Sequence, residues 1–329
     1  MLRLGIAGFR HSHIYSLVNA AKNSERVECV GFWEEYPDDI KNAEENYGIK
    51  VTHKTFEDML SDPNIDAIGI GNYYGARGKM AIEALKAGKH VIADKPLCTS
   101  LAELEEIKRL SEEKGLTVGI MLDLRHHKNV LAAKKIIYEG KIGEIHNIQF
   151  GGQHPLMYGV RPAWYFEEGK HGGVINDIGI HGVDLISYFT GCEISEIIGA
   201  RCWNAYAKEE PLFKDCGQFM LTLSNGAGVI ADISYSVPNS IGFNIPYYWE
   251  FKIWGSQGML CFSASTDGVK LYINGEKDVL EVLPIETDDN YLEAFIDEVL
   301  GKKSSLLSID DVFNSSEATL LIQKKADEI

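Results

Sequence analysis

In the first third of the chain, short apolar runs alternate with stretches whose apolar residues recur every three or four positions. The first pattern is typical of buried strands and the second of amphipathic helices. The predicted strands are Leu2–Ala7, Val27–Trp33, Ile65–Ile70, His90–Ala93 and Thr117–Leu122. The predicted helices cover Ile14 to Ala21, the residues before Gly48, Lys79–Ala87, and Ser100 to Gly115. This alternation implies a parallel sheet with both faces covered, the doubly wound nucleotide-binding architecture.

The second part of the chain has a different pattern, in which strands follow one another directly. After a predicted helix at Asn129–Glu139, the predicted strands are Ile145–Gly151, Ile194–Trp203, Gln218–Leu223, Ala227–Tyr235, Trp249–Trp254, Met259–Ser263 and Val269–Ile273. Asn225-Gly226 and Asn274-Gly275 are typical of tight hairpin turns. Helices are predicted near Asp177–Phe189, at Asn290–Leu300 and at Ile309–Lys325. We therefore predict a large, mostly antiparallel mixed sheet with a few helices.

The two patterns predict two domains. A length of 329 residues agrees with this division. We expect a dinucleotide-binding Rossmann domain over residues 1–123 and an α+β domain over 124–329. The second domain would bind substrate and mediate self-association into a dimer or tetramer, an expectation that rests on fold analogy alone.

Charge and cysteine content narrow the function classes. The formal net charge of -16 disfavours nucleic acid and anionic membrane surfaces as partners. The six cysteines form no C-x-x-C pair, which favours free thiols in a reducing compartment. No apolar run is long enough to span a bilayer, and the first residues are predicted to form a strand rather than a leader. We expect a cytoplasmic protein.

The turn after the first predicted strand is a candidate phosphate loop. Gly8 stands where a dinucleotide fingerprint has its first glycine, but Arg10 and His13 stand at the second and third glycine positions. A strand-to-helix turn without a ligand would look the same. Glu34 ends the second strand, where an acid can bind the ribose 2′-hydroxyl, or it is an ordinary solvated charge. Arg10 could pair with the pyrophosphate or block its approach.

Two downstream motifs resemble those of the Gfo/Idh/MocA oxidoreductase family. The first is Ala84-Leu85-Lys86-Ala87-Gly88-Lys89-His90-Val91, followed by Asp94-Lys95-Pro96. The second is the Gly-Gly-x-x-x-Asp-x-Gly-x-His-x-x-Asp run from Gly172 to Asp184. Leu124-Arg125, followed by Gly140-Lys141-Ile142-Gly143-Glu144, is a weaker third match. The family usually has Thr-Pro-Asn and then His after its fourth strand, whereas this chain has Asn72-Tyr73-Tyr74 and Arg77.

The resemblance implies a reaction centre at Lys95, Asp177 and His181. Oxidation of an alcohol needs a base for the hydroxyl proton, and a histidine suits this role because its pKa lies near neutrality. Asp177 and His181 are four residues apart, so on one helix they would share a face. The resemblance also implies that Lys95 points at the reacting hydroxyl and that Asp94 lies beside the nicotinamide. The expected cofactor residues are Gly8, Phe9, Arg10, Glu34, Asn72, Tyr73, Asp94 and Lys95.

Several residues between and after the motifs are candidate substrate ligands. Trp164 could stack on a sugar or cyclitol ring, although Trp164 and Tyr165 could equally be core aromatics. The full set of candidates is Arg125, His154, Trp164, Tyr165, Asn176 and Tyr235. We expect no metal site, because the histidines show neither His-x-x-x-His nor Cys/His spacing.

The resemblance and the candidate residues together predict an enzyme that oxidises a secondary hydroxyl of a sugar, cyclitol or related polyol. NAD is expected rather than NADP, because a carboxylate at Glu34 would repel a 2′-phosphate. Two alternatives stay open. One is a lyase or glycosidase that uses bound NAD transiently, and the other is a non-catalytic sugar- or nucleotide-binding protein.

Overall fold

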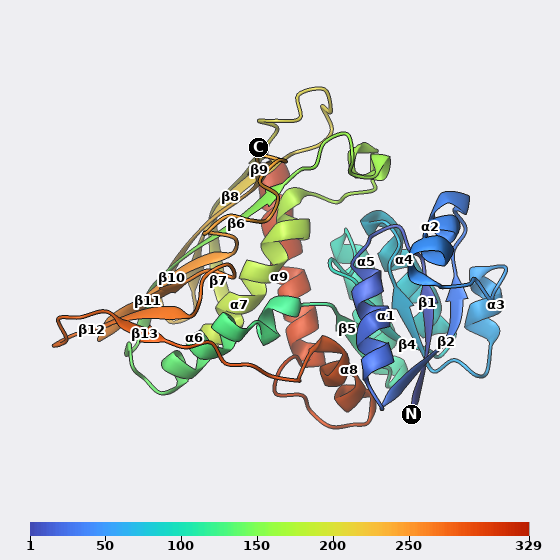
Figure 1. Ribbon diagram of the computed structural model, residues 1–329, viewed down its shortest axis with the longest axis horizontal. Coiled ribbons are helices and arrows are strands. Elements are labelled where there is room, and N and C mark those ends of the chain that lie inside the picture. The colour runs from blue at the N-terminus through green and yellow to red at the C-terminus, as the bar shows by residue number, and fades with distance from the viewer. Residues whose placement is uncertain (329) are drawn as a thin grey trace. The chain divides into compact units, whose positions relative to one another are not determined.

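The protein divides into two compact units, seen in a computed structural model that describes residues 1–328 (Figure 1). The first unit comprises Met1–Leu122, Gly169–Gly172 and Asp289–Ser316. The second comprises Asp123–Glu168, Gly173–Asp288 and the residues from Glu317 onward. Each unit is built on one sheet.

The first unit contains the predicted parallel sheet. Its strands are β1 (Leu2–Ala7), β2 (Val27–Trp33), β3 (Ala67–Ile70), β4 (His90–Ala93) and β5 (Val118–Ile120), in the order β2-β1-β3-β4-β5. All neighbouring strands are parallel. The doubly wound architecture predicted from the sequence is thereby confirmed. Its central strands, β3 and β4, are almost wholly buried, as strands covered on both faces must be.

Six helices of the described chain belong to this unit. They are α1 (Ile14–Asn23), α2 (Pro37–Tyr47), α3 (Phe56–Ser61), α4 (Tyr74–Lys86), α5 (Leu101–Lys114) and α8 (Tyr291–Val299). Helix α3 was not predicted, although Thr55 and Asp58 form a capping box at its start. Helix α4 begins five residues before the predicted Lys79. Its first turn buries Arg77, a polar residue that conceals the apolar periodicity.

The second unit contains the large mixed sheet. Its strands are β6 (Ile145–Pro155), β7 (Ile194–Trp203), β8 (Cys216–Leu223), β9 (Gly228–Val237), β10 (Glu250–Gly255), β11 (Gly258–Phe262), β12 (Val269–Ile273) and β13 (Leu280–Val282). The strand order is β13-β12-β11-β10-β6-β9-β8-β7, and only the β6–β9 pair is parallel. The predicted antiparallel-rich sheet is confirmed. The sequence reading missed β13, a short exposed strand at one edge.

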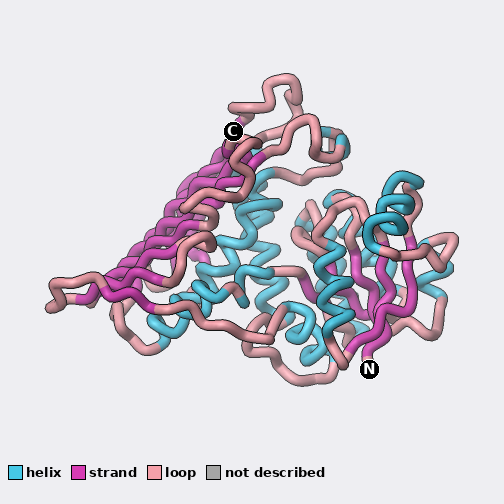
Figure 2. Tube along the Cα trace, in the orientation of Figure 1, coloured by secondary structure: helices cyan, strands magenta, loops and turns pink. Residues whose placement is uncertain are grey.

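The register of the strands explains why one face of this sheet is buried and the other is exposed. A continuous cross-strand row on that face consists of Leu221, Val229, Ile148, Ile253, Leu260 and Leu271, all buried. The adjacent row on the other face includes Met220, Ile230, Gln149 and Lys270, all exposed. Alternation with a period of two produces these two rows. The helices α6 (Lys128–Tyr138) and α7 (Ile180–Thr190) contact strands of this sheet (Figure 2).

The remaining helical segments are short turns and one long C-terminal helix. The 3-10 helices are η1 (Asp123–His126) and η2 (Ala163–Phe166), and η3 (Ile175–Gly179) is a π-helical turn. Helix α9 (Ile309–Asp327) contributes to both units, because its residues up to Ser316 belong to the first unit and those from Glu317 to the second.

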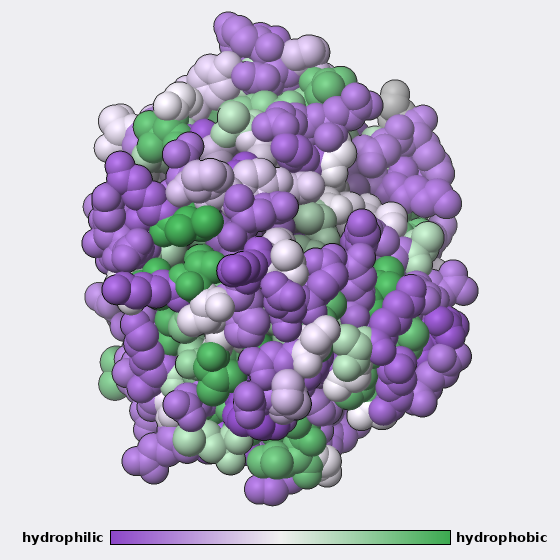
Figure 3. All heavy atoms as spheres, turned by 90° about the vertical axis from the view of Figure 1, so that its right-hand side faces the viewer, coloured by the Kyte–Doolittle hydropathy of each residue, from purple (hydrophilic) through white to green (hydrophobic). Residues whose placement is uncertain are grey.

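The polarity of the surface and the state of the cysteines agree with what the sequence predicts. On the face drawn in Figure 3, hydrophilic residues predominate and apolar ones form small scattered groups. All six cysteines are free thiols, with Cys98 and Cys216 buried and the others half-buried. Among residues 1–328, no helix has the length and apolar character that crossing a membrane requires.

Gly182 offers a test of the packing between α7 and the large sheet. A Cβ at this position would overlap the ring of Phe150 on β6. Alanine normally stabilises a helix relative to glycine by ~1 kcal/mol, but here the overlap reverses the sign. We expect Gly182→Ala to lower the free energy of unfolding by about 2 kcal/mol in urea titrations followed by circular dichroism.

Gly199→Ala on β7 is the matched control, because a Cβ there meets nothing within 4 Å. We expect it to change stability by less than ~0.5 kcal/mol. If Gly182→Ala proves as stable as the parent chain, the packing between α7 and β6 described above is wrong.

Candidate active site

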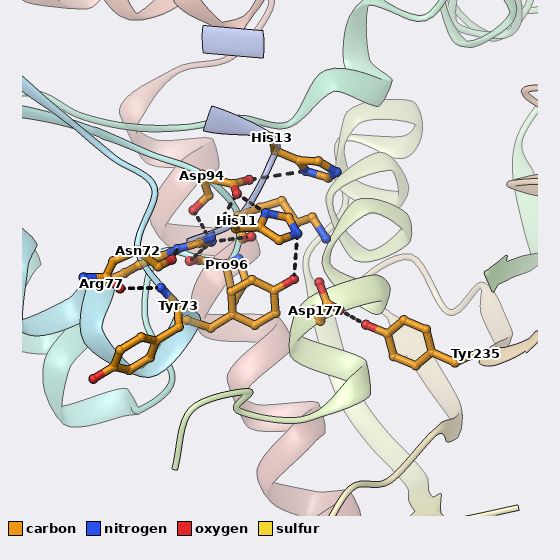
Figure 4. A network of polar contacts seen from close by, with 11 residues as sticks. His11, His13, Asn72, Tyr73, Arg77, Asp94, Pro96, Asp177 and Tyr235 are labelled. Atoms are coloured by element: carbon orange, nitrogen blue, oxygen red, sulfur yellow. Dashed lines mark hydrogen bonds and ion pairs between the residues drawn. The ribbon is translucent and has the colours of Figure 1, made fainter. Parts of the chain in front are cut away.

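A buried guanidinium organises the carboxyl ends of β3 and β4 in the first unit (Figure 4). Arg77, on the first turn of α4, is 0% exposed. Its Nε donates to the carbonyl of Asn72 at 2.8 Å, and its Nη1 donates to the carbonyls of Asp94, Lys95 and Pro96 at 2.9, 2.6 and 3.2 Å. Its Nη2 donates to Oδ2 of Asp94 at 2.9 Å. One side chain therefore fixes both turns on which the family motif depends.

Asp94 is the acid at the centre of this cluster. It is fully buried, and Oδ2 also contacts Nδ1 of His11. Burial is the largest single influence and opposes ionisation, but Arg77, His11 and His13 together outweigh it and hold the pKa of Asp94 well below its usual range. Burial lowers the pKa of His11 to about 3, despite the attraction of Asp94. The cluster therefore contains a carboxylate and a neutral imidazole, whose Nε2 lies 3.2 Å from the hydroxyl of Tyr74.

Lys95, predicted to be catalytic, follows this acid directly. Its side chain is buried, with the residue 5% exposed, and its backbone carbonyl is held by Arg77. The Lys95–Pro96 peptide is cis. Arg77, on α4, therefore holds the backbone of the residue that carries the ammonium.

Glu34 holds the turn after β1, which contains Gly8, through a hydrogen bond to its backbone. Gly8 has φ of +85°, and a Cβ there would lie 2.8 Å from the backbone nitrogen of Asn72, so the turn requires glycine. The Glu34 carboxylate accepts hydrogen bonds from the amides of Phe9, Glu35 and Tyr36 at 2.5, 2.8 and 2.9 Å. Burial raises the pKa of Glu34, and the three backbone donors oppose that rise. Glu34 is 3% exposed, so it is not the solvated charge of the alternative reading.

Arg10 lies away from the start of α1. Its Nη1 donates to Oδ2 of Asp39 at 3.0 Å, and its guanidinium carbon lies 3.9 Å from the centre of the Tyr36 ring. In the described part of the chain, no hydrogen bond satisfies the amides of Ser12 and His13 at the start of α1. Such amides bind phosphate oxygens at helix N-termini. The turn therefore fits a dinucleotide pyrophosphate even without the second and third fingerprint glycines.

Asn72 and Tyr73, the other predicted cofactor residues, lie at the start of α4. The Asn72 side chain accepts a hydrogen bond from the Tyr73 amide at 2.8 Å and is buried. Tyr73 precedes the helix, and Lys170 Nζ lies 5.1 Å from its ring centre. A Cβ on Gly75 would overlap the carbonyl oxygen of Gly169, so the segment Gly169–Gly172 packs directly on this helix start.

In the second unit, Asp177 lies on the π-helical turn η3 rather than on α7. A regular helix through both Asp177 and His181 was expected, but the regular helix begins only at Ile180. π-turns occur frequently at functional sites. The hydroxyl of Tyr235, on β9, donates to Oδ2 of Asp177 in a short hydrogen bond (Figure 4). The partner of Asp177 was among the predicted substrate residues, but the pairing itself was not predicted.

His181 has an acidic neighbour that the sequence reading missed. Its Nδ1 lies 3.6 Å from Oδ1 of Asp123, on η1. The side chain of Asp123 is 60% exposed, so solvent screens its attraction for an imidazolium. The ring of Trp249 packs edge-on against His181, with ring centres 5.2 Å apart. His181 is thus an imidazole held between an aromatic face and a carboxylate, with 6% of its surface exposed.

Arg125 and the two aromatics of η2 are interior residues. The Arg125 guanidinium makes a bidentate pair with Asp184, with distances of 2.8 and 2.7 Å, and both side chains are 2% exposed. Trp164 and Tyr165 are 1% and 2% exposed, with ring centres 4.1 Å apart. These environments favour core packing over substrate stacking. We therefore propose structural roles for all three residues.

The other predicted substrate residues have different surroundings. His154, at the end of β6, is half-buried in an aromatic cage formed by Tyr235, Phe243, Tyr248 and Trp249. Asn176, on η3, is 1% exposed, and its amide donates to Oε1 of Gln323 at 3.3 Å.

Comparison with known proteins identifies the class to which this fold and these residues belong. A family model described as "Oxidoreductase family, NAD-binding Rossmann fold" matches residues 2–122. The "GFO/IDH/MocA C-terminal domain" model matches residues 130–261. The chain belongs to the Gfo/Idh/MocA family of oxidoreductases, as the sequence motifs indicated.

Individual relatives are distant. The uncharacterised oxidoreductase YrbE of Bacillus subtilis (strain 168) is 28% identical over 200 residues, which cover 59% of this chain and 56% of YrbE. The scyllo-inositol 2-dehydrogenase (NAD(+)) of the same organism is 27% identical over 270 residues, 78% of this chain and 71% of that enzyme. A putative oxidoreductase from Erwinia carotovora atroseptica SCRI1043 has a TM-score of 0.90 at 23% identity, covering 99% of both chains, which shows the shared fold.

The hydrogen bonds of Arg77 predict how a substitution at this position changes stability. Lysine is flexible and has only three donors, so Arg77→Lys cannot satisfy the five acceptors that the planar guanidinium reaches. We expect the substitution to lower the free energy of unfolding by about 3 kcal/mol, measured by urea titration. Arg109→Lys is the control, because the exposed Arg109 pairs with Glu106 and Glu113 on its own helix, where solvent screens the ion pairs. Equal stabilities for the two variants would contradict the organising role of Arg77.

Proposed function

We propose that the protein catalyses the reversible, NAD-dependent oxidation of a secondary hydroxyl on a sugar, cyclitol or related polyol. The observation that carries this proposal is the environment of His181, an imidazole between Trp249 and Asp123. A carboxylate beside Nδ1 stabilises the imidazolium that forms when a histidine accepts a proton. The family membership and the phosphate-compatible turn at Gly8 support the same reaction class.

The roles divide as follows. His181 takes the hydroxyl proton as general base and returns it in the reverse direction. For the Lys95 ammonium we propose the role of stabilising a developing alkoxide. Asp177 and Tyr235, joined by a hydrogen bond, position the substrate beside His181. A bound nicotinamide would supply the hydride acceptor, so the loss of one proton and one hydride would balance the oxidation.

Glu34 and Arg10 support NAD rather than NADP as the cofactor. Glu34 places a carboxylate at the end of β2, where it would repel a 2′-phosphate. Arg10 does not offset this repulsion, because Asp39 already pairs with its guanidinium. Relatives include scyllo-inositol 2-dehydrogenases named for NAD(+) and for NADP(+). The proposed preference for NAD over NADP therefore rests on Glu34 and Arg10 of this chain and not on its relatives.

The substrate class is inferred from two sources. Relatives at 24–27% identity include enzymes named for scyllo-inositol, levoglucosan and D-xylose, which share ring or chain secondary hydroxyls. Among the rings around His154, Phe243 is 50% exposed and offers an apolar surface suited to the C–H side of such a molecule. The cytoplasmic location and the dimeric or tetrameric state stay predictions. Exposed Met220, Ile230 and Tyr272 on the large sheet favour self-association there.

The first functional prediction concerns His181. We expect His181→Ala to reduce kcat at least ~100-fold with NAD and the best polyol of a panel of inositols, aldoses and alditols, followed by NADH absorbance. NAD affinity, followed by fluorescence titration, should change little. His146→Ala is the control, because His146 is exposed on β6. Unchanged turnover in His181→Ala would remove His181 from the reaction.

The same panel separates the alternatives. Substrate that disappears without any accumulation of NADH would favour the lyase or glycosidase alternative. Saturable NAD binding without turnover of any compound would favour a non-catalytic binding protein. Either result would overturn the proposed dehydrogenase activity while leaving the family assignment intact.

The second functional prediction concerns the cofactor preference. We expect kcat/KM to favour NAD over NADP by at least ~10-fold, corresponding to roughly 1.4 kcal/mol of repulsion at Glu34. Glu34→Gln should narrow this ratio, whereas Glu35→Gln, at the exposed neighbouring position, should not. A parent enzyme that uses NADP as well as NAD would contradict the assigned role of Glu34.

A further inference from the structure

Three potential metal ligands meet at the carboxyl edge of the parallel sheet. His11 and His13 come from the turn between β1 and α1, and Asp94 follows β4. Their ligand atoms all lie within 4.8 Å of one another, and the described chain has no other such group of three or more (Figure 4). Two imidazoles and one carboxylate form a donor set suited to divalent transition metals.

The second oxygen of Asp94 provides an independent indication of a ligand. Oδ1 is buried and accepts no hydrogen bond within the described residues. Its neighbour is Nδ1 of His13 at 3.5 Å, which is beyond a normal hydrogen bond. A buried carboxylate oxygen without a donor is destabilising, and more so when the group is charged. The oxygen therefore faces an imidazole nitrogen across a space in which a cation would bind both.

Against the expectation from the histidine spacing, we propose that His11, His13 and Asp94 bind a divalent transition-metal ion such as Zn²⁺, Mn²⁺ or Fe²⁺. Metal–nitrogen and metal–oxygen bonds of ~2.0–2.2 Å place two ligands of a tetrahedral ion roughly 3.3 Å apart. The 3.5 Å between His13 Nδ1 and Asp94 Oδ1 is close to that spacing. Nδ1 of His11 contacts the other oxygen of the same carboxylate, Oδ2, and would exchange that contact for the ion.

The outer contacts of His11 and Asp94 match those of metal ligands. The hydroxyl of Tyr74 lies 3.2 Å from Nε2 of His11 and can hold that ring once Nδ1 binds the ion. Arg77 holds Oδ2 of Asp94, which leaves Oδ1 for the metal.

The burial pattern also indicates an open site rather than a closed structural one. Asp94 and His11 have side chains 0% and 9% exposed, whereas that of His13 is 49% exposed. Three protein ligands with an accessible side leave coordination positions for water or for a bound anion. The nearby positive charge of Arg77 weakens the attraction for a cation, so we expect exchangeable binding that a chelator removes.

Metal binding can be measured directly on the untagged full chain, without dinucleotide or polyol. After EDTA treatment, we expect calorimetric titration with ZnCl₂ or MnCl₂ to give one site per chain. Co²⁺ should give visible absorption bands that report nitrogen and oxygen ligands. His13→Ala should weaken affinity at least ~10-fold, and Asp94→Asn should do the same. His13 is the safer variant for folding, because its side chain is half-exposed.

His53→Ala is the matched control. His53 also contacts a carboxylate, with Nε2 3.2 Å from Asp62 Oδ2, but it belongs to no three-ligand group. Its affinity for metal should equal that of the parent chain. The absence of saturable binding in the parent chain, or equal binding by the parent chain and His13→Ala, would overturn the proposed site. Neither result bears on the dehydrogenase activity, which the NADH assay tests separately.

Discussion

The hydrogen bonds of the Arg77 guanidinium constrain the first unit more than any other polar contact described above. A buried charge is tolerated only when it is paired and its donors are satisfied. Arg77 meets that condition by holding the carbonyls of Asn72, Asp94, Lys95 and Pro96 together with the Asp94 carboxylate. The turns after β3 and β4 therefore form one hydrogen-bonded body. The backbone positions of Asp94 and Lys95, on which the proposed chemistry depends, follow from it.

Most of the fold could be predicted because burial leaves a regular trace in the sequence. The strands β1, β2, β4, β7 and β12 begin and end where the apolar runs do. Predictions failed where the trace is interrupted or too short. Arg77 is polar yet buried, so it concealed the first turn of α4. The six residues of α3 and the three of β13 are too few to establish a period.

The site could be predicted less completely, because motifs identify residues but not their partners. The motifs located Lys95, Asp177 and His181, but no spacing rule relates His181 to Asp123, which lies 58 positions earlier. The assumption of one regular helix through Asp177 and His181 failed because a π-turn has a different residue spacing. Composition also cannot distinguish a buried Arg125–Asp184 pair from a substrate-binding arginine, since both use the same residue types.

The departures from the family pattern are not independent of one another. His13 occupies the position of the third fingerprint glycine, His11 lies two residues before it, and Arg77 replaces the usual histidine. In the structure all three side chains approach Asp94. The guanidinium engages one carboxylate oxygen, while an imidazole faces the other. Arg77 at Oδ2 therefore neutralises the buried acid, whereas Oδ1, which faces His13, is the oxygen that can bind a ligand.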